Sequence, residues 1–158
     1  MTNAIFVLNG PNLNLLGTRE PEVYGTETLD DLKERCERKA QGIGLGIDFR
    51  QSNAEGDLVN WIQEAREEAA GLIVNAGAFT HTSIAMLDAL LACDIPIVEV
   101  HLSNIFTREP FRHRSYISRA AKGVICGFGG LGYELAIEAL ASAISEGQGG
   151  MTDRKGRQ

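Results

Sequence analysis

Short apolar runs alternate with amphipathic stretches along this chain. Four of the runs are rich in Val, Ile and Leu without strict alternation, which is typical of strands that are covered on both faces. A fifth run alternates more, because Ile47 and Phe49 stand beside Asp48 and Arg50, and this pattern favours an edge strand. The predicted strands are Ala4–Leu8, Leu45–Arg50, Gly71–Val74, Ile95–Val100 and Gly123–Cys126.

Between the strands, apolar residues recur at spacings of three and four, which indicates helices with one apolar face. A capping-box pattern at Thr28–Asp31 opens the first helix, and Gly42 and Gly44 are expected to stop it. A second such pattern, Ser52–Glu55, precedes the next helix, and Thr82–Ser83 can open the third. The last helix is marked by Tyr133, Ile137, Leu140 and Ile144.

Strict alternation of strands and helices predicts an α/β fold with a parallel sheet and right-handed crossovers. Five strands fit the smaller, flavodoxin-like doubly wound type, with strand order 2-1-3-4-5. We expect one catalytic domain over residues 1–146. Residues 147–158 are Gly-rich and then polar and basic, and this composition predicts a disordered tail.

Composition narrows the classes of function. A chain of 158 residues is one domain by size, and a hydrophobic content of 44% is enough for a core. The net charge of −6 argues against a nucleic-acid partner. No apolar run approaches the ~18 residues that span a membrane, and no signal peptide is visible, so we expect a cytoplasmic location. The scattered Cys36, Cys93 and Cys126 indicate core residues in a reducing compartment.

A long polar segment separates the first strand from the first helix. It runs from Asn9 to Gly25, where a loop after a buried strand is normally much shorter. Leu13 and Leu16 offer apolar surface to bury, which argues against disorder. The segment is therefore interpreted as a binding loop or lid, with a capped surface loop as the alternative.

Unusual polar residues cluster after three of the predicted strands, at the edge where ligands bind in such folds. They are Asn9, Asn12, Arg19 and Tyr24 after the first strand, Asn75 and His81 after the third, and Glu99, His101, Arg108 and Arg112 at the end of the fourth. Glu99 and His101 share one face of an extended segment, so the carboxylate can orient the imidazole for catalysis. A structural polar pair, surface arginines and a capping role for His81 remain the alternatives.

Other chemical signals are weaker. The segment Gly127–Gly132 matches the dinucleotide pattern GxGxxG, but it follows the last strand, so tight packing of a helix or subunit is the better interpretation. Glu99, His101, His81 and Asp88 lack a recognised zinc spacing, and arginines crowd the region, so we expect no metal. No phosphate loop is present, and the lack of a serine elbow argues against serine hydrolysis. We also expect no cofactor.

Three motifs taken together resemble those of the type II 3-dehydroquinate dehydratases, enzymes of the shikimate pathway. The motifs are Asn9-Gly10-Pro11-Asn12-Leu13-Asn14 running on to Arg19 and Tyr24; Asn75-Ala76-Gly77-Ala78-Phe79-Thr80-His81-Thr82-Ser83; and Glu99-Val100-His101-Leu102-Ser103-Asn104 with Arg108 and Arg112. The resemblance covers about Ala4 to Ile144 and implies a flavodoxin-like fold. Phe79 and Leu87 depart from residues that are common in that family, and neither is a catalytic position.

The resemblance implies a role for each matching position. Tyr24 resembles the general base that removes a proton beside the substrate ketone, and Arg19 the group that stabilises its phenolate. His101 resembles the general acid, with Glu99 behind it, while Asn12 and a water stabilise the enolate. The substrate, 3-dehydroquinate, is expected to be held by Asn75, His81 and Arg112 and by the amides of Leu102 and Ser103.

The resemblance also implies a homo-oligomer, a dodecamer built of trimers, in which Asp88 reaches a neighbouring subunit's site. Two other classes of function stay open at this point. One is a flavin- or nucleotide-binding module on the same sheet. The other is a non-catalytic oligomer that binds carboxylates without turnover.

Overall fold

The structure is a computed structural model that describes residues 3–18 and 21–155, with the backbone alone described for residues 23, 24 and 149–155. Its centre is a five-stranded sheet in which every neighbouring pair is parallel. The strands are β1 (Ala4–Asn9), β2 (Gly46–Gln51), β3 (Gly71–Asn75), β4 (Ile97–His101) and β5 (Gly123–Cys126), in the order β2-β1-β3-β4-β5. The predicted flavodoxin-like order is therefore confirmed, and β2 is an edge strand as its alternation indicated.

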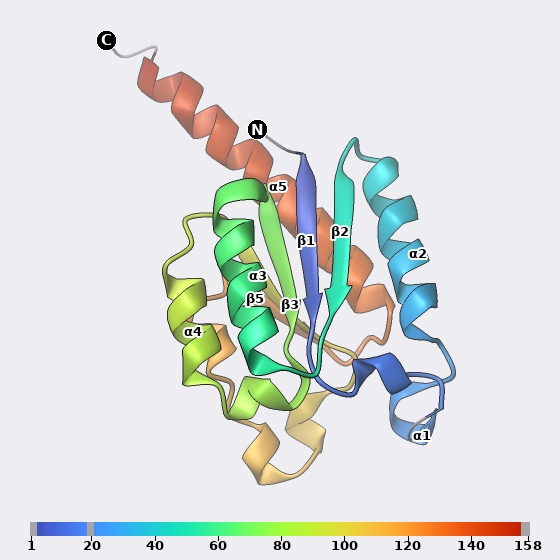
Figure 1. Ribbon diagram of the computed structural model, residues 1–158. Coiled ribbons are helices and arrows are strands. Elements are labelled where there is room, and N and C mark those ends of the chain that lie inside the picture. Colours follow the sequence, from blue (N-terminus) through green and yellow to red (C-terminus); the bar gives the residue numbers. More distant parts are fainter. Residues whose placement is uncertain (1–2, 19–20, 156–158) are drawn as a thin grey trace.

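Helices cover both faces of the sheet, with α2 and α5 on one face and α3 and α4 on the other (Figure 1). The longer helices are α2 (Leu29–Gln41), α3 (Glu55–Glu68), α4 (Ile84–Leu91) and α5 (Leu131–Lys155). Short helical turns lie between them: η1 (Leu13–Leu15), α1 (Pro21–Tyr24), η2 (Gly77–His81), η3 (Ile105–Thr107), η4 (Pro110–Arg112) and η5 (Ile117–Arg119). Among the described residues, none of these helices is long and apolar enough to cross a bilayer.

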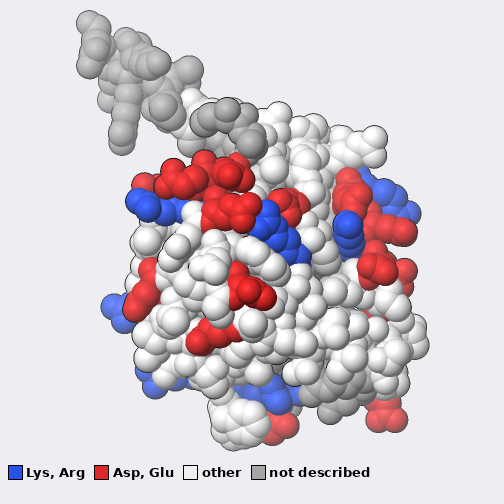
Figure 2. Space-filling model, viewed as in Figure 1, with Lys and Arg blue, Asp and Glu red and all other residues white. Residues whose placement is uncertain are grey.

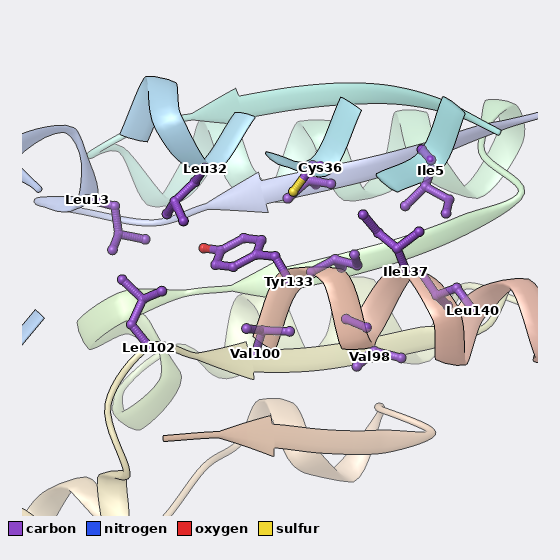
Figure 3. Packing of buried hydrophobic residues seen from close by; sticks show 14 of the residues in the cluster. Ile5, Leu13, Leu32, Cys36, Val98, Val100, Leu102, Tyr133, Ile137 and Leu140 are labelled. Atoms are coloured by element: carbon purple, nitrogen blue, oxygen red, sulfur yellow. The ribbon is translucent and has the colours of Figure 1, made fainter. Parts of the chain in front are cut away.

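Strand β1 divides the core into two layers because successive side chains of a strand point to opposite faces. Ile5 and Val7 pack under α2 and α5 with Tyr133 and Leu140, as Figure 3 shows for most of this cluster. Phe6 and Leu8 belong to the second cluster, under α3 and α4. A strand buried on both faces needs apolar residues at every position, which explains the unbroken apolar run of β1.

Strand β5 differs from the expectation that it is covered on both faces. Ile125 lies against α5, near Gly132, but Val124 points the other way and is 43% exposed. A strand at the edge has one neighbour only, and within the described part of the chain α5 is the helix with the main contacts to β5. The apolar composition of a parallel strand does not reveal which strand is last in the sheet, so this burial prediction was wrong.

Two predicted helix starts are confirmed, and a third is wrong. Thr28 and Asp31 form the predicted reciprocal capping box of α2, and Ser83 caps α4 through the backbone N–H of Met86. Ser52 does not cap α3, whose N-cap is Ala54. The Ser52 hydroxyl instead donates to Asp57 and accepts from the Ala54 N–H, so it stabilises the turn before the helix.

Helix α5 extends to Lys155 and so continues past Glu146, where a disordered tail was expected. The boundary at residue 146 stays a prediction. At the other end of α5, the glycines of the GxGxxG segment differ in their surroundings. A Cβ on Gly130, which is not one of the three pattern glycines, would lie 2.1 Å from Glu27 Oε1 and 2.8 Å from Leu32 Cδ2, whereas one on Gly129 would meet no described atom within 4 Å. The packing interpretation of the pattern therefore stays a prediction. On the face shown in Figure 2, acidic side chains cover more area than basic ones, in line with the net charge of −6.

Candidate active site

The carboxyl ends of β1, β3 and β4 lie next to one another and form a pocket. Asn9 and Asn75 are register partners in β1 and β3, and the Gly10 N–H donates to the Asn75 carbonyl at 2.8 Å. The pocket at these ends is lined by Pro11, Asn12, Leu13, Leu16, Asn75, Gly77, Ala78, His81, His101, Leu102, Ser103, Ile105, Arg108 and Arg112. The three motifs that stood far apart in the sequence therefore meet at one site.

His101 and Glu99 form the buried centre of this pocket. His101 is 5% exposed and lies on the pocket wall, whereas Glu99 is 1% exposed and lies behind it. His101 Nε2 contacts Glu99 Oε2 through a hydrogen bond in which an ionised carboxylate accepts, so Nε2 carries a proton. The tautomer is thereby fixed, and Nδ1 is the ring nitrogen that remains for a ligand.

Glu99 is held as an anion by two serine hydroxyls as well as by His101. The hydroxyl of Ser118 donates to Oε1 at 2.6 Å, and that of Ser115 donates to the same carboxylate at 2.9–3.0 Å. Burial acts to raise the pKa of Glu99, but the hydrogen bonds from His101, Ser118 and Ser115 outweigh it and lower the pKa below its ordinary value. The buried carboxylate is thus ionised at neutral pH.

His81 is poised to accept a hydrogen bond from a ligand. Its Nδ1 lies 2.7 Å from the carbonyl oxygen of Arg114, which can only accept, so Nδ1 carries the proton. Burial lowers the pKa of His81 from its ordinary value, which favours the neutral ring at pH 7. In that form Nε2 has a free lone pair, suited to a hydroxyl group.

Asn12 stands at the entrance to the pocket in an uncommon backbone conformation. Its φ is +68°, in the left-handed region that Asn tolerates better than most residues. The side chain of Asn53 accepts from the Asn12 N–H at 2.9 Å and secures the turn. Such a conformation at a pocket is typical of residues whose position serves a ligand.

Two arginines contribute positive charge to one wall of the pocket. Arg112 donates from Nε to Glu109 at 2.8 Å and lies over the ring of Phe111. Arg108 also lines the pocket. Leu102 and Ser103, directly after β4, also line the pocket. A guanidinium beside backbone amides suits a carboxylate.

Three predicted site residues are not placed in this pocket. Arg19 lies outside the described residues. Tyr24 ends α1, and its side chain is not among those described. Asp88 lies on the exposed side of α4 and does not line the pocket of this chain. The roles of these three residues therefore stay predictions.

Some residues at the site were not assigned from the sequence. Leu13, Leu16 and Ile105 supply its apolar lining, and the first two had been noted only as surface that a loop would bury. Ser115 and Ser118, which hold Glu99, were not noticed at all. Their signal is weak, because a serine in an irregular segment has no pattern that marks it.

No group of three or more His, Cys, Asp or Glu that could hold a metal ion occurs within the part of the chain that the structure describes. The thiol of Cys36 is fully buried, and this burial raises its pKa to about 12. Burial also raises the pKa of Cys93. Both are therefore thiols rather than reactive thiolates at neutral pH.

Known proteins share both the sequence and the fold. A chain of Brucella canis named 3-dehydroquinate dehydratase is 58% identical over 146 residues, which are 92% of this chain and 93% of its own length. A Pseudomonas aeruginosa protein named 3-dehydroquinate dehydratase 2 is 57% identical over 141 residues, 89% of this chain and 95% of its own.

The solved type II dehydroquinase of Propionibacterium acnes superposes with a TM-score of 0.86 at 44% identity. The match covers 90% of this chain and 98% of that one. The family model described as dehydroquinase class II matches residues 3–141, which include all three motifs and the whole sheet. The chain therefore belongs to the class II dehydroquinase family.

Proposed function

We propose that this protein is a hydro-lyase that dehydrates 3-dehydroquinate to 3-dehydroshikimate in the shikimate pathway. Membership of the class II dehydroquinase family and the names of its relatives support the substrate and the reaction. The observation that carries the chemistry is the Glu99–His101 pair. Its fixed tautomer leaves one ring nitrogen at a pocket that offers both polar groups and positive charge.

The elimination needs a base for the carbon acid beside the ketone, and we assign this role to Tyr24. Only about one free tyrosine in a thousand is ionised at neutral pH, so a base of this kind needs a cation that stabilises the phenolate. Arg19 lies five residues earlier in the same segment and is the candidate. Closure of the segment over the pocket would exclude water and strengthen that interaction.

The leaving hydroxyl needs a proton, and we assign its delivery to His101. Once both ring nitrogens are protonated, Nδ1–H can pass its proton to the departing hydroxyl while Glu99 stabilises the imidazolium. Asn12, with a water, stabilises the negative charge on the enolate oxygen between the two proton transfers. The trans course of the elimination requires the base and the acid to act on opposite faces of the substrate.

The polyhydroxylated, carboxylic substrate matches the chemistry of the pocket walls. The neutral His81 accepts from a hydroxyl, and the Asn75 carboxamide can bind another. Arg112 and the amides of Leu102 and Ser103 suit the carboxylate. Since no lysine lines the pocket among the described residues, a Schiff-base route is disfavoured.

We also propose that the chain assembles into a dodecamer of four trimers in the cytoplasm, with Asp88 at a neighbouring subunit's site. Large apolar side chains exposed on a single chain support association. They include Ile84 and Leu91 on α4, which are 55% and 54% exposed, and Val124 on β5. Asp88 lies on the same short helix as the first two.

The two other classes of function are not favoured. The GxGxxG segment follows β5, and among the described residues no later strand carries the acid that would bind a nucleotide's ribose. A carboxylate-binding protein without turnover would have no need for a histidine whose tautomer is fixed by a buried carboxylate. That second class is excluded only by an assay.

The test is a metal-free, cofactor-free assay with 3-dehydroquinate that follows the ultraviolet absorbance of the conjugated enone product. Wild type should turn over, and Tyr24→Phe and His101→Ala should each lower kcat by about 10²–10⁴-fold without change in the oligomer. Turnover should survive borohydride, because no lysine imine forms. A folded wild-type protein that binds the substrate without producing enone would overturn the proposal.

A further inference from the structure

A buried row of hydrogen bonds connects helix α5 to the pocket. The hydroxyl of Tyr133 donates to Asn9 Oδ1 at 2.6 Å and accepts from Asn75 Nδ2 at 2.9 Å. Asn9 and Tyr133 are fully buried, and Asn75 is 3% exposed at the pocket wall. In Figure 3 the hydroxyl of Tyr133 points along the sheet toward Leu13 and Leu102, which line the pocket.

The direction of every bond in this row is set at its inner end. Asn9 Nδ2 donates to the carbonyl oxygen of Arg50 at 2.9 Å, and a carbonyl can only accept. The Asn9 carboxamide must therefore turn its oxygen toward Tyr133. Tyr133 must donate its single proton to that oxygen, because burial raises the pKa of this phenol and keeps it protonated.

The consequence reaches Asn75. With its proton committed to Asn9, the Tyr133 oxygen can only accept, so Asn75 must turn its NH₂ group toward Tyr133 and its carbonyl away. The backbone N–H of Gly77 favours the same orientation, but its contact with Asn75 Oδ1 is 3.4 Å and hence weak. Of the two contacts, the hydrogen bond to Tyr133 does more to set the orientation of the Asn75 carboxamide.

We propose that Tyr133 is a positioning residue that fixes the orientation of the Asn75 carboxamide, and so decides which of its polar atoms faces the substrate. This role rests on the proposed function, in which Asn75 binds a substrate hydroxyl. Tyr133 itself does not line the pocket. It acts through Asn75 alone, and this property separates the proposal from a general contribution to packing.

The decisive experiment is a double-mutant cycle in the full-length protein, with Tyr133→Phe, Asn75→Ala and the combination of both. Tyr133→Phe keeps the ring and its packing but removes the donor and acceptor. It should raise the KM for 3-dehydroquinate about tenfold and change kcat less than threefold, because a ground-state contact is weakened. In the Asn75→Ala background the same change should have no further effect on KM.

Ile137→Val supplies the matched control, because Ile137 is fully buried one turn further along α5 and does not contact the pocket. Its small effect on KM should be the same in the wild-type and Asn75→Ala backgrounds. If Tyr133→Phe raises KM by the same factor in both backgrounds, its role is packing and the proposal is wrong. An unchanged KM in the single variant overturns it equally.

A second readout does not depend on turnover. The side-chain NH₂ signals of Asn75, observed by ¹⁵N-resolved NMR, should show one slowly exchanging environment in the wild type and averaging or a second environment in Tyr133→Phe. Asn9→Ala, which frees the Tyr133 proton, should perturb the same signals and serves if Tyr133→Phe does not fold. Unperturbed signals contradict the proposal, whereas a wild-type protein without turnover contradicts the proposed function alone.

Discussion

The two sides of the proposed reaction are built differently. The acid, His101, ends a central strand, and each polar atom of its partner Glu99 is held by a histidine or a serine. The assigned base, Tyr24, belongs to the segment from residue 11 to Gly25, whose described residues are held by short turns, by the buried Leu13 and Leu16 and by the hydrogen bond from the Asn12 N–H to Asn53. The acid is fixed by burial within the sheet, and the segment that carries the base is held by these fewer contacts.

This difference indicates how the site divides its work. An acid that must protonate one oxygen at one position gains from a rigid setting, since no reorganisation is needed when charge develops. A base on a loop that moves can admit the substrate first and complete the site afterwards. Changes at the strand ends should therefore act on stability or on kcat, and changes in the segment should leave the fold intact.

The largest effect is expected from Gly10→Ala, at the point where the strand ends lie closest together. A Cβ on Gly10 would lie 2.1 Å from the Ala76 carbonyl oxygen, and neither backbone can yield without breaking the β1–β3 contact. We expect a loss of about 4 kcal/mol in the free energy of unfolding, measured with urea.

Gly25→Ala is the matched control for Gly10→Ala, because its new Cβ would meet no atom of the described residues within 4 Å, chain neighbours aside, and the φ of +80° is the unfavourable feature. It should cost about 1–2 kcal/mol. Equal losses for the two variants would contradict the proposed division between a rigid and a locally held region.

Glu99→Gln should have the next largest effect, on catalysis. The amide occupies the same space but cannot stabilise an imidazolium by charge, and its NH₂ group does not match the donors that surround it. We expect kcat to fall about 10²-fold, which corresponds to about 2.7 kcal/mol, with KM little changed. Stopped-flow or steady-state assays of enone formation measure kcat. A kcat within threefold of wild type would show that Glu99 does not support His101 as the acid.

Ser118→Ala tests how the carboxylate behind His101 is held, through the pH dependence of the free energy of unfolding. The native pKa of Glu99 lies below its ordinary value of 4.5, so its hydrogen bonds stabilise the fold above that pH, and this contribution is lost as the pH falls through the native pKa. The variant should be less stable than wild type by about 1–2 kcal/mol at pH 7, with a smaller difference near pH 3.

The control for Ser118→Ala is Ser142→Ala on the exposed side of α5, which should change stability by less than about 0.5 kcal/mol at either pH. A difference between Ser118→Ala and wild type that is independent of pH would mean that the hydroxyl does not act through the Glu99 charge.

The smallest effect on stability is expected for changes at Asn12, within the segment that carries the base. Asn12 has a left-handed backbone, which a glycine adopts without strain and an alanine does not. Asn12→Gly should therefore be more stable than Asn12→Ala by about 1 kcal/mol, while both lose activity because the carboxamide is gone. Thermal unfolding of the two variants measures the difference, and a more stable Asn12→Ala would contradict the local account.

The sheet order could be predicted because apolar runs and helical stripes are local patterns, and alternating units leave few possible topologies. The capping box at Thr28 is equally local. The helix start predicted at Ser52 was wrong because the hydroxyl of Ser52 bonds to Asp57 instead of capping α3. A sequence pattern does not show which of several possible partners a hydroxyl binds.

At the site, Asn75, His81 and the Glu99–His101 pair were predicted because they follow strands whose ends meet. Ser115 and Ser118 were missed because they reach Glu99 from an irregular segment. Tyr133 was recognised only as part of an apolar stripe, since a hydroxyl on a core-facing side chain does not reveal its partners. Polar contacts across long sequence distances are what periodicity cannot show.

The bond between Tyr133 and Asn9 also concerns the order in which the molecule is made. It joins residues 124 positions apart, on the first strand and the last helix. The pocket wall is therefore complete only after α5 has packed against β1. Contacts of such long range form late in folding, because the intervening chain must first be closed into a loop. A nascent chain that has not yet released α5 would therefore carry all the residues of the pocket and still be unable to hold its substrate.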